Sequence, residues 1–289
     1  MTRRDILTAV PTSFHPDGTL DEPGSRAIFR HVAQSGNEGA FVLGTTGEFP
    51  SVDDTEFRTI VSAALEEMSK VMRVVVHVGQ SSAFEAVRRM RVAQSLGATE
   101  FAAMTPYFLV SSERGMFDYF SKLSDQLAGG ELYVYIYPAR SGNSVSASLL
   151  ARLSGLPGIV GAKVSELPLE TIAEYRAAVP EGFIIYTGAD RDLVNAANAG
   201  AQGVVSGVSS ILPKPFRALA AAADEGNSEL IAAAQDDVDD VVRVIGGDMA
   251  SMKMALRLMG IADGVCRMAL DTPDAAAVSE LERVIAAYR

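Results

Sequence analysis

Cysteine and histidine are scarce in this sequence. Its 289 residues include one cysteine, Cys266, and three histidines, His15, His31 and His77. A single thiol excludes an internal disulfide framework and a cysteine-based structural zinc site, and the three imidazoles are widely separated along the chain. We therefore expect no metal cofactor and a reducing, cytoplasmic setting.

Positive charge is also in short supply. Lysine and arginine number 25 against 36 aspartates and glutamates, which gives a formal net charge of −11 and a pI near 4.8. A protein without excess cations gains little by displacing counterions from a phosphate backbone. Nucleic acid is therefore not an expected partner.

Long apolar runs are missing as well. No stretch reaches the roughly 18 consecutive apolar residues that a membrane span requires. Residues 1–11 carry two arginines but no adequate apolar stretch after them, so we expect no signal peptide. No proline- or serine-rich linker marks a domain boundary. The sequence indicates a soluble protein with no membrane partner.

Apolar residues make up 48% of the chain, enough to bury a large core. The length suits two ordinary domains or one α/β barrel, and the absence of a linker favours the barrel. Short β-branched runs alternate with helical periodicity, and strand and helix repeated in this way predict an α/β fold, a (β/α)8 TIM barrel. The eight predicted strands are residues 6–10, 40–43, 74–78, 101–104, 132–136, 159–164, 183–186 and 204–206.

Helix signals are clearest between the second and fourth predicted strands. Apolar residues over 57–68 recur with the period of one helical face, and Ser51 with Asp54 three residues later predicts the N-terminal cap. A second helix is predicted to start at residues 81–82 and to stop near Gly97, a residue type that tolerates a left-handed C-terminal cap.

The chain after the eighth predicted strand is longer than one barrel helix requires. Residues 213–289 are helical in pattern, so we expect two or three extra C-terminal helices. The predicted organisation is a barrel over residues 1–212 and, over 213–289, the end of the barrel with a helical extension, the whole forming one catalytic unit.

Lys163 lies inside an apolar segment, residues 158–164, that is typical of a buried strand. Burial disfavours the ammonium, lowers its pKa and leaves a neutral amine that can form a Schiff base with a carbonyl group. The alternative is a lysine at a strand end whose ammonium extends to water.

Two further motifs follow predicted strands. Gly-Thr-Thr-Gly-Glu at residues 44–48 predicts a tight turn whose N–H groups converge on an anion, although most such turns are structural. In the fifth strand, Tyr133, Tyr135 and Tyr137 alternate onto one face, where packing is the simpler interpretation for the first and last. Arg140 then follows in the loop, as a carboxylate ligand or as one half of a surface ion pair.

Together these motifs resemble one family. Gly-Thr-Thr-Gly-Glu at 44–48, Tyr-x-x-Pro at 135–138 and Gly-x-Lys at 161–163 occur in the order and approximate spacing of the dihydrodipicolinate synthase and N-acetylneuraminate lyase family. The similarity continues through Tyr107, residues 188–190 and residues 203–206. It covers nearly the whole chain.

The resemblance implies a fold, a chemistry and a set of site residues. Members of that family are class I aldolases on (β/α)8 barrels, usually homotetramers built from tight dimers, and they need no metal or organic cofactor. Their small-molecule partners are pyruvate, held as a covalent imine, and an aldehyde. The implied roles are the Schiff-base lysine for Lys163, the proton-relay tyrosine for Tyr135 with Thr45, the pyruvate-carboxylate clamp for Thr45 and Thr46, and a substrate contact for Val205.

The second substrate stays open. Arg140 matches an arginine that binds the aldehyde's carboxylate in the synthase subgroup, which favours pyruvate and aspartate semialdehyde. Two departures oppose this: Phe108 replaces a tyrosine whose hydroxyl crosses the family's dimer interface, and Ile136 replaces an asparagine. Tyr137 and Ala139 are similar to residues of sugar-acid aldolases and sialate lyases. The alternatives are a 2-keto-3-deoxy sugar-acid aldolase, an N-acetylneuraminate-lyase-like enzyme, a hydratase-aldolase, and an inactive 2-oxo-acid-binding protein.

Overall fold

The computed structural model describes residues 5–289. The predicted absence of a signal peptide concerns residues 1–11, of which residues 1–4 lie outside the described part. All eight predicted strands are present, with ends within one residue of the predicted ones. They are β1 (Asp5–Ala9), β2 (Gly39–Val42), β3 (Arg73–His77), β4 (Glu100–Met104), β5 (Glu131–Ile136), β6 (Ile159–Val164), β7 (Ile184–Thr187) and β8 (Gly203–Ser206).

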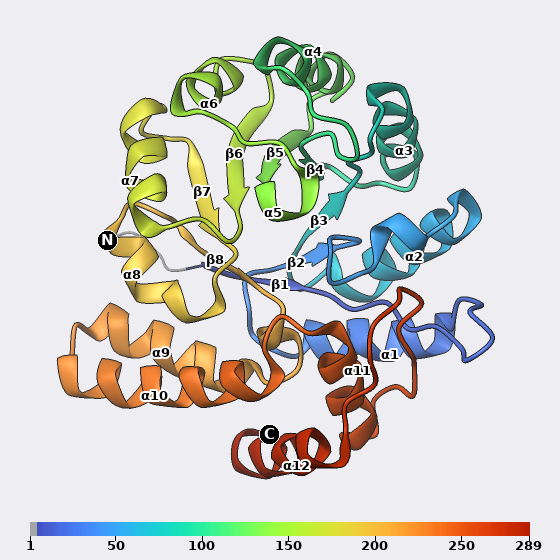
Figure 1. Ribbon diagram of the computed structural model, residues 1–289, viewed down its shortest axis with the longest axis vertical. Coiled ribbons are helices and arrows are strands. Elements are labelled where there is room, and N and C mark those ends of the chain that lie inside the picture. Colours follow the sequence, from blue (N-terminus) through green and yellow to red (C-terminus); the bar gives the residue numbers. More distant parts are fainter. Residues whose placement is uncertain (1–4) are drawn as a thin grey trace. The chain divides into compact units, whose positions relative to one another are not determined.

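The strands form a closed barrel in chain order, β1 to β8 (Figure 1). Parallel pairing of strands that are successive in the chain requires a crossover between them, and helices supply these connections. The structure confirms the predicted (β/α)8 fold. The helices are α1 (Glu22–Ala33), α2 (Asp54–Met68), α3 (Ala83–Ser95), α4 (Glu113–Ser124), α5 (Pro138–Ser141), α6 (Ala147–Leu153), α7 (Leu169–Ala178), α8 (Leu193–Asn198), α9 (Pro213–Glu225), α10 (Ser228–Ile245), α11 (Met249–Leu258) and α12 (Ala275–Tyr288).

The helices after β8 also match the expectation. Within the described residues, α9 serves as the helix of the last βα unit, and α10, α11 and α12 are three further helices. Helix α10 packs along α9, and α12 contacts both α10 and α11. The predicted boundary at residue 212 remains a prediction.

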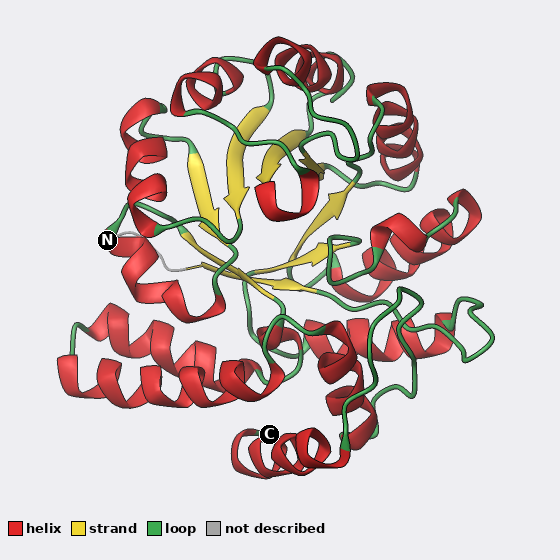
Figure 2. Ribbon diagram, viewed as in Figure 1, coloured by secondary structure: helices red, strands yellow, loops and turns green. Residues whose placement is uncertain are grey.

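Two compact units make up the chain, residues 75–205 and residues 5–74 with 206–289. In the first unit, the strands lie on the inner side of α4, α6 and α7 (Figure 2). Its largest fully buried side chains are the aromatic residues Phe101, Phe120, Tyr133, Tyr135 and Tyr186. In the second unit they are Phe14, Phe29, Phe41, Phe57 and Phe216.

The start of α2 differs from the prediction. The cap is Asp53, whose side chain accepts from the Glu56 N–H at 2.8 Å, while the Glu56 side chain accepts from the Asp53 N–H at 3.1 Å. Ser51 instead ends the short 3-10 helix η1 (Phe49–Ser51). Asp53 and Glu56 form the reciprocal pair of bonds predicted for Ser51 and Asp54. The observed cap therefore lies two residues later than the predicted one.

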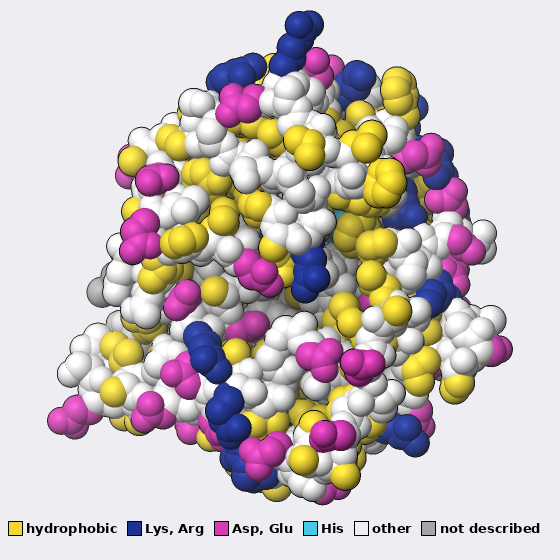
Figure 3. All heavy atoms as spheres, viewed as in Figure 1, with side chains coloured by type: hydrophobic (Ala, Val, Ile, Leu, Met, Phe, Trp, Pro, Cys, Tyr) yellow, Lys and Arg dark blue, Asp and Glu magenta, His cyan; other side chains and the backbone are white. Residues whose placement is uncertain are grey.

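The start of α3 agrees with the prediction: Ser82 is its cap, and Gly97 has the left-handed φ of 99°. Among residues 5–289, no helix is both long and apolar enough to cross a membrane. Acidic side chains are interspersed with basic ones over the face drawn in Figure 3.

Candidate active site

Lys163 lies in the interior of β6, with 5% of its surface exposed. Strand β6 is paired on both sides, so Lys163 stands opposite Tyr135 of β5 and opposite Tyr186 of β7. The Lys163 Nζ lies 4.3 Å from the centroid of the Tyr135 ring. The lysine is thus buried rather than extended to water.

This burial changes the ionisation of Lys163. Desolvation lowers the pKa of its ammonium from 10.5 to about 7, and the negative charge of Asp190 partly opposes that shift. Asp190 begins the short 3-10 helix η2 (Asp190–Asp192), which follows β7. A substantial fraction of Lys163 is therefore a neutral amine near neutral pH, the form that attacks a carbonyl carbon.

Tyr135 is surrounded by other rings. It is 1% exposed, and the His77 ring meets it edge-on with centroids 5.9 Å apart. His77 is itself buried, and its Nε2 accepts a hydrogen bond from the Met104 N–H at 3.1 Å. These contacts restrict the orientation of the Tyr135 ring beside Lys163. His77 is thus a packed histidine of the barrel interior.

Gly161, the glycine of the Gly-x-Lys motif, lies where no side chain would fit. It pairs with Tyr133 across β5 and β6. A Cβ at this position would lie 2.4 Å from the Ile184 carbonyl oxygen and 2.7 Å from the Tyr133 ring. Only glycine permits this close approach two residues before Lys163.

Arg140, Tyr137 and Glu166 form a cluster next to Tyr135. The Tyr137 ring lies 6.0 Å from that of Tyr135, and its hydroxyl donates a hydrogen bond to Glu166. Arg140 is exposed, and its Nε donates to the Tyr137 hydroxyl at 3.4 Å. Burial and the bond to Glu166 raise the pKa of Tyr137 to about 12, so the phenol keeps its proton.

Sequence reasoning missed Glu166 and treated Tyr137 as a packing residue. The only local signal is conformational: Glu166 has φ of 54°, a left-handed conformation that is uncommon for a residue other than glycine. Such a conformation cannot be identified from residue type. Tyr137 is buried against the Tyr135 ring, as a packing residue would be, and its hydroxyl in addition donates to Glu166.

The departures Phe108 and Ile136 lie in different environments. Ile136 is fully buried at the end of β5. Phe108 is 91% exposed, with φ of 80°, in the loop after β4. The buried Asn143 side chain fixes this loop by donating to the carbonyls of Pro106 and Leu109 at 2.7 and 3.1 Å.

Val205 is buried in β8, in the same compact unit as Lys163. The structure gives it no polar side-chain role, as its side chain is purely apolar. Only its backbone groups can meet a polar substrate.

Thr45 and Thr46 lie in the second unit, in the turn that follows β2. The turn closes through bonds from the Gly47 N–H to the Gly44 carbonyl and from the Glu48 N–H to the Thr45 carbonyl, each 3.0 Å. Both threonines are partly exposed, while the residues on either side of them are buried. The predicted tight turn is therefore present, and its two threonines are half-buried.

Glu48, the last residue of the same motif, is completely buried. Its carboxylate forms an ion pair with Lys253 of α11, with Oε1 and Nζ 2.5 Å apart. The sequence motif contains Glu48 but gives no sign that Lys253 is its partner. No local pattern links residues 205 positions apart.

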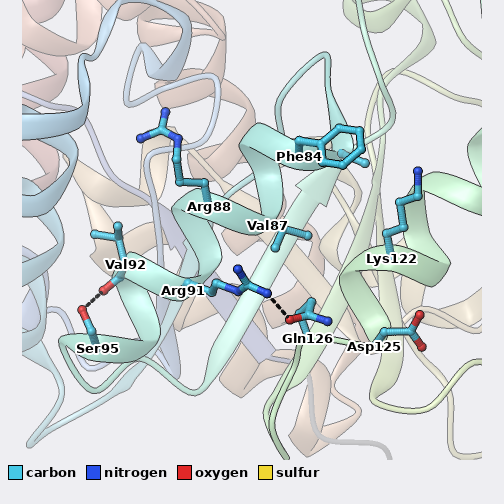
Figure 4. Close-up of a pocket in the computed structure, with 10 residues that line it drawn as sticks. Phe84, Val87, Arg88, Arg91, Val92, Ser95, Lys122, Asp125 and Gln126 are labelled. Atoms are coloured by element: carbon cyan, nitrogen blue, oxygen red, sulfur yellow. Dashed lines mark hydrogen bonds between the residues drawn. The ribbon is translucent and has the colours of Figure 1, made fainter.

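A cavity of about 660 Å³ lies between α3 and α4 (Figure 4). Phe84 and Lys122 face each other there, with the ammonium 5.0 Å from the ring centroid, and Arg91 donates to Gln126 at 2.6 Å. Its lining contains none of the predicted site residues. Within residues 5–289, no group of three or more His, Cys, Asp or Glu side chains is placed to hold a metal ion.

Comparison with known sequences extends over the whole chain. The sequence profile of the Dihydrodipicolinate synthetase family matches residues 2–288. A protein of Ralstonia nicotianae named 4-hydroxy-tetrahydrodipicolinate synthase is 30% identical over 282 residues, covering 96% of this chain and 94% of that protein. A protein of the same name from Methanothermobacter thermautotrophicus is 28% identical over 92% of this chain and 96% of its own length.

Solved structures agree with the sequences. Dihydrodipicolinate synthase from Thermotoga maritima superposes with a TM-score of 0.90 at 27% identity, covering 99% of both chains. A structure described as a monomeric dihydrodipicolinate synthase variant also has a TM-score of 0.90 at 27% identity, covering 99% of this chain and 96% of that one. The expected enzyme class, a lyase of the Schiff-base aldolase type, agrees with this assignment. The chain belongs to the Dihydrodipicolinate synthetase family.

Proposed function

We propose that this protein is a class I aldolase that forms an imine between pyruvate and Lys163. The observation that carries the proposal is the burial of Lys163 beside the Tyr135 ring, with its pKa lowered to about 7. Few lysines are buried this completely, and a lowered pKa supplies the nucleophile that imine formation requires.

The chemistry follows from the amine. Lys163 attacks the ketone carbon of pyruvate, and the resulting carbinolamine loses water to give a protonated imine. This imine withdraws electrons, so a proton leaves C3 and the enamine attacks the aldehyde carbon, forming a C–C bond. Water then releases the product and regenerates the amine. The reverse sequence cleaves the same bond and releases pyruvate.

Tyr135 is the proposed proton carrier for these steps, with Thr45 as its hydroxyl partner. The Lys163 Nζ lies over the Tyr135 ring, which supports this role, because each step moves a proton to or from a group near that nitrogen. Thr45 and Thr46 are proposed to bind the pyruvate carboxylate through the N–H and hydroxyl donors of their turn. Val205 is proposed to contact the substrate through its backbone. The proposal requires no metal or organic cofactor.

Aspartate semialdehyde is the proposed second substrate. It is supported by the name 4-hydroxy-tetrahydrodipicolinate synthase that similar proteins carry and by Arg140, an exposed guanidinium suited to the aldehyde's carboxylate. One observation favours a 2-keto-3-deoxy sugar acid instead: Glu166 shares the Tyr137 hydroxyl with Arg140 and brings a negative charge to the same place.

The first experiment is borohydride trapping. Incubation with pyruvate and borohydride, followed by intact mass measurement and peptide mapping, should give a reduced pyruvyl adduct on Lys163 and none on a Lys163→Arg variant. Absence of an adduct would refute pyruvate as the donor and favour the inactive binding protein. Product assays with aspartate semialdehyde and a panel of 2-keto-3-deoxy acids then identify the second substrate.

A cytoplasmic location and a homo-oligomeric state are part of the proposal. The first is supported by the scarcity of cysteine, and the second by the family to which the chain belongs. Sedimentation at several protein concentrations tests the oligomeric state.

A further inference from the structure

The Glu48 carboxylate accepts hydrogen bonds from the C-terminal part of the chain. Its Oε1 accepts from Lys253 Nζ, and its Oε2 accepts from the backbone N–H groups of Arg267 and Met268 at 2.8 and 2.6 Å. Lys253 also donates to the Val265 carbonyl at 2.7 Å. The carboxylate at the end of the Thr45–Thr46 turn therefore contacts both α11 and the segment 265–268.

Arg267 forms a second set of contacts between segment 265–268 and the N-terminal part of the chain. Its guanidinium forms two hydrogen bonds with Glu56, at 2.7 and 2.6 Å, and donates to the Ser51 carbonyl at 2.6 Å. The centroid of the Phe14 ring lies 4.0 Å from the Arg267 Cζ and 4.8 Å from the Lys253 Nζ. Segment 265–268 thus has fixed contacts on both sides of η1, the 3-10 helix that follows the turn.

Burial of this ion pair needs a reason beyond stability. Taking two charges out of water costs about as much as their attraction returns, and an apolar pair of similar volume is often at least as stable. What the pair does supply is a fixed orientation of the Glu48 side chain. Glu48 has a left-handed φ of 55°, and its N–H closes the turn on the Thr45 carbonyl. Its side chain and its backbone therefore act on the same turn.

We propose that Glu48 and Lys253 are positioning residues for the pyruvate-carboxylate turn, which makes α11 and segment 265–268 a functional part of that site. The proposal rests on the proposed function for the meaning of the turn. It assigns the position of the turn to contacts more than 200 residues away in sequence, because those contacts hold the side chain of the residue whose N–H closes the turn.

The test is the Glu48→Gln variant. Glutamine offers one oxygen and one NH2 group where the site presents three donors, so a donor faces a donor and the turn loses its fixed position. Borohydride trapping at a series of pyruvate concentrations should give a half-saturating concentration about ten to a hundred times that of the wild type, with the adduct still forming at saturation.

Glu38→Gln is the matched control. Glu38 precedes β2, whereas Glu48 follows it, and it likewise accepts from a cation, Arg217 at 2.6 Å, and from a backbone N–H, that of Ile6 at 2.7 Å. It does not belong to the Thr45–Thr46 turn. Loss of its charge should lower the melting temperature and leave the half-saturating pyruvate concentration unchanged.

Cys266 supplies a second measurement that needs no substrate. It is the only cysteine, it lies between Val265 and Arg267, and burial raises the pKa of its thiol to about 11. The Glu48 charge also raises the Cys266 pKa directly, so the comparison uses the rate constant of the thiolate, read from a pH series. If Glu48 holds this segment, that rate constant should rise about fivefold or more in Glu48→Gln with a disulfide reagent, and should not rise in Glu38→Gln. An unchanged Cys266 rate in Glu48→Gln would overturn the proposal.

The double variant Glu48→Gln/Lys253→Met keeps the test possible if Glu48→Gln alone does not fold. It removes both charges, so no ion is left buried alone, and it should fold even if the single variant does not. A wild-type half-saturating concentration in either folded variant overturns the positioning role. If the wild type itself gives no adduct, the proposed function fails, and the Cys266 rates still decide whether Glu48 holds the segment.

Discussion

Lys163 and Tyr135 stand directly opposite each other on β6 and β5, with the lysine Nζ 4.3 Å from the tyrosine ring centroid. The strand register fixes this relationship, because side chains of paired residues in a parallel sheet point to the same face. A flexible lysine is thereby confined beside one ring. The attraction between an ammonium and an aromatic face also favours this arrangement whenever the lysine is charged.

The first prediction concerns the ionisation of Lys163. Its pKa is about 7 when folded and 10.5 ordinarily, so between these values the unfolded chain binds a proton that the folded chain does not. Stability should therefore rise with pH across this window. In Lys163→Met this contribution, at most about 5 kcal/mol, should disappear, and denaturant unfolding at pH 7 and pH 10 should show a smaller rise than in the wild type. An identical rise would contradict the lowered pKa.

The second prediction concerns Tyr135. Replacement by phenylalanine keeps the ring beside Lys163 and removes the hydroxyl, so turnover should fall about 10²- to 10⁴-fold, the usual effect of losing a proton-transfer group. Tyr133→Phe is the control, since Tyr133 is equally buried on the same strand and its ring packs against Tyr186 with centroids 6.0 Å apart. Steady-state kinetics on both variants make the comparison. Equal losses would remove Tyr135 from the mechanism.

The third prediction separates the two second substrates. Arg140→Ala should lower turnover of pyruvate with aspartate semialdehyde about 10- to 150-fold, the effect of losing a hydrogen bond to a charged group, and should leave the pyruvate imine intact. Parallel loss of imine formation would refute the assigned role.

Glu166→Gln tests the same cluster by removing its negative charge, where Arg140→Ala removes the positive one. Removing the negative charge beside Arg140 should lower the KM for an aldehyde that carries a carboxylate. For an uncharged polyhydroxy aldehyde, the same change should leave KM unchanged or raise it. A KM for both aldehydes that moves in the same direction would show that Glu166 does not discriminate by charge.

The fourth prediction concerns Gly161. Gly161→Ala would bring a Cβ to 2.4 Å from a backbone oxygen that cannot move away independently, so we expect about 1 to 3 kcal/mol of destabilisation. Gly182→Ala is the control, because an added Cβ there meets no atom within 4 Å. Chemical denaturation of both variants measures the difference. Equal stabilities would mean that β6 and β7 relax around the added methyl group.

Most of the barrel can be predicted from its periodicity. Apolar runs such as residues 159–164 identify strands because a strand buried on both faces has no polar positions. Capping is harder: Ser51 and Asp53 are both acceptable caps, and the reciprocal bond with Glu56 decides between them. Local composition cannot rank two caps that lie two residues apart.

Some residues of the candidate site can likewise be identified from local sequence, and others cannot. Lys163 and the Thr45–Thr46 turn stand out because a lysine in an apolar run and a pair of glycines around threonines are unusual locally. Glu166 and Lys253 do not stand out. One depends on a left-handed backbone conformation, and the other on a partner 205 positions away.

The sequence by itself determined the eight strands, the helices between them, and the lysine around which the chemistry is proposed, because periodicity and burial preference are properties of short segments. Only the tertiary structure decided which groups each side chain contacts: the ring beside Lys163, the carboxylate that accepts from Tyr137, and the cation that pairs with Glu48. These contacts join residues on different elements. Their energies, and hence the pKa values and positions they set, depend on distances that exist only once the chain has folded.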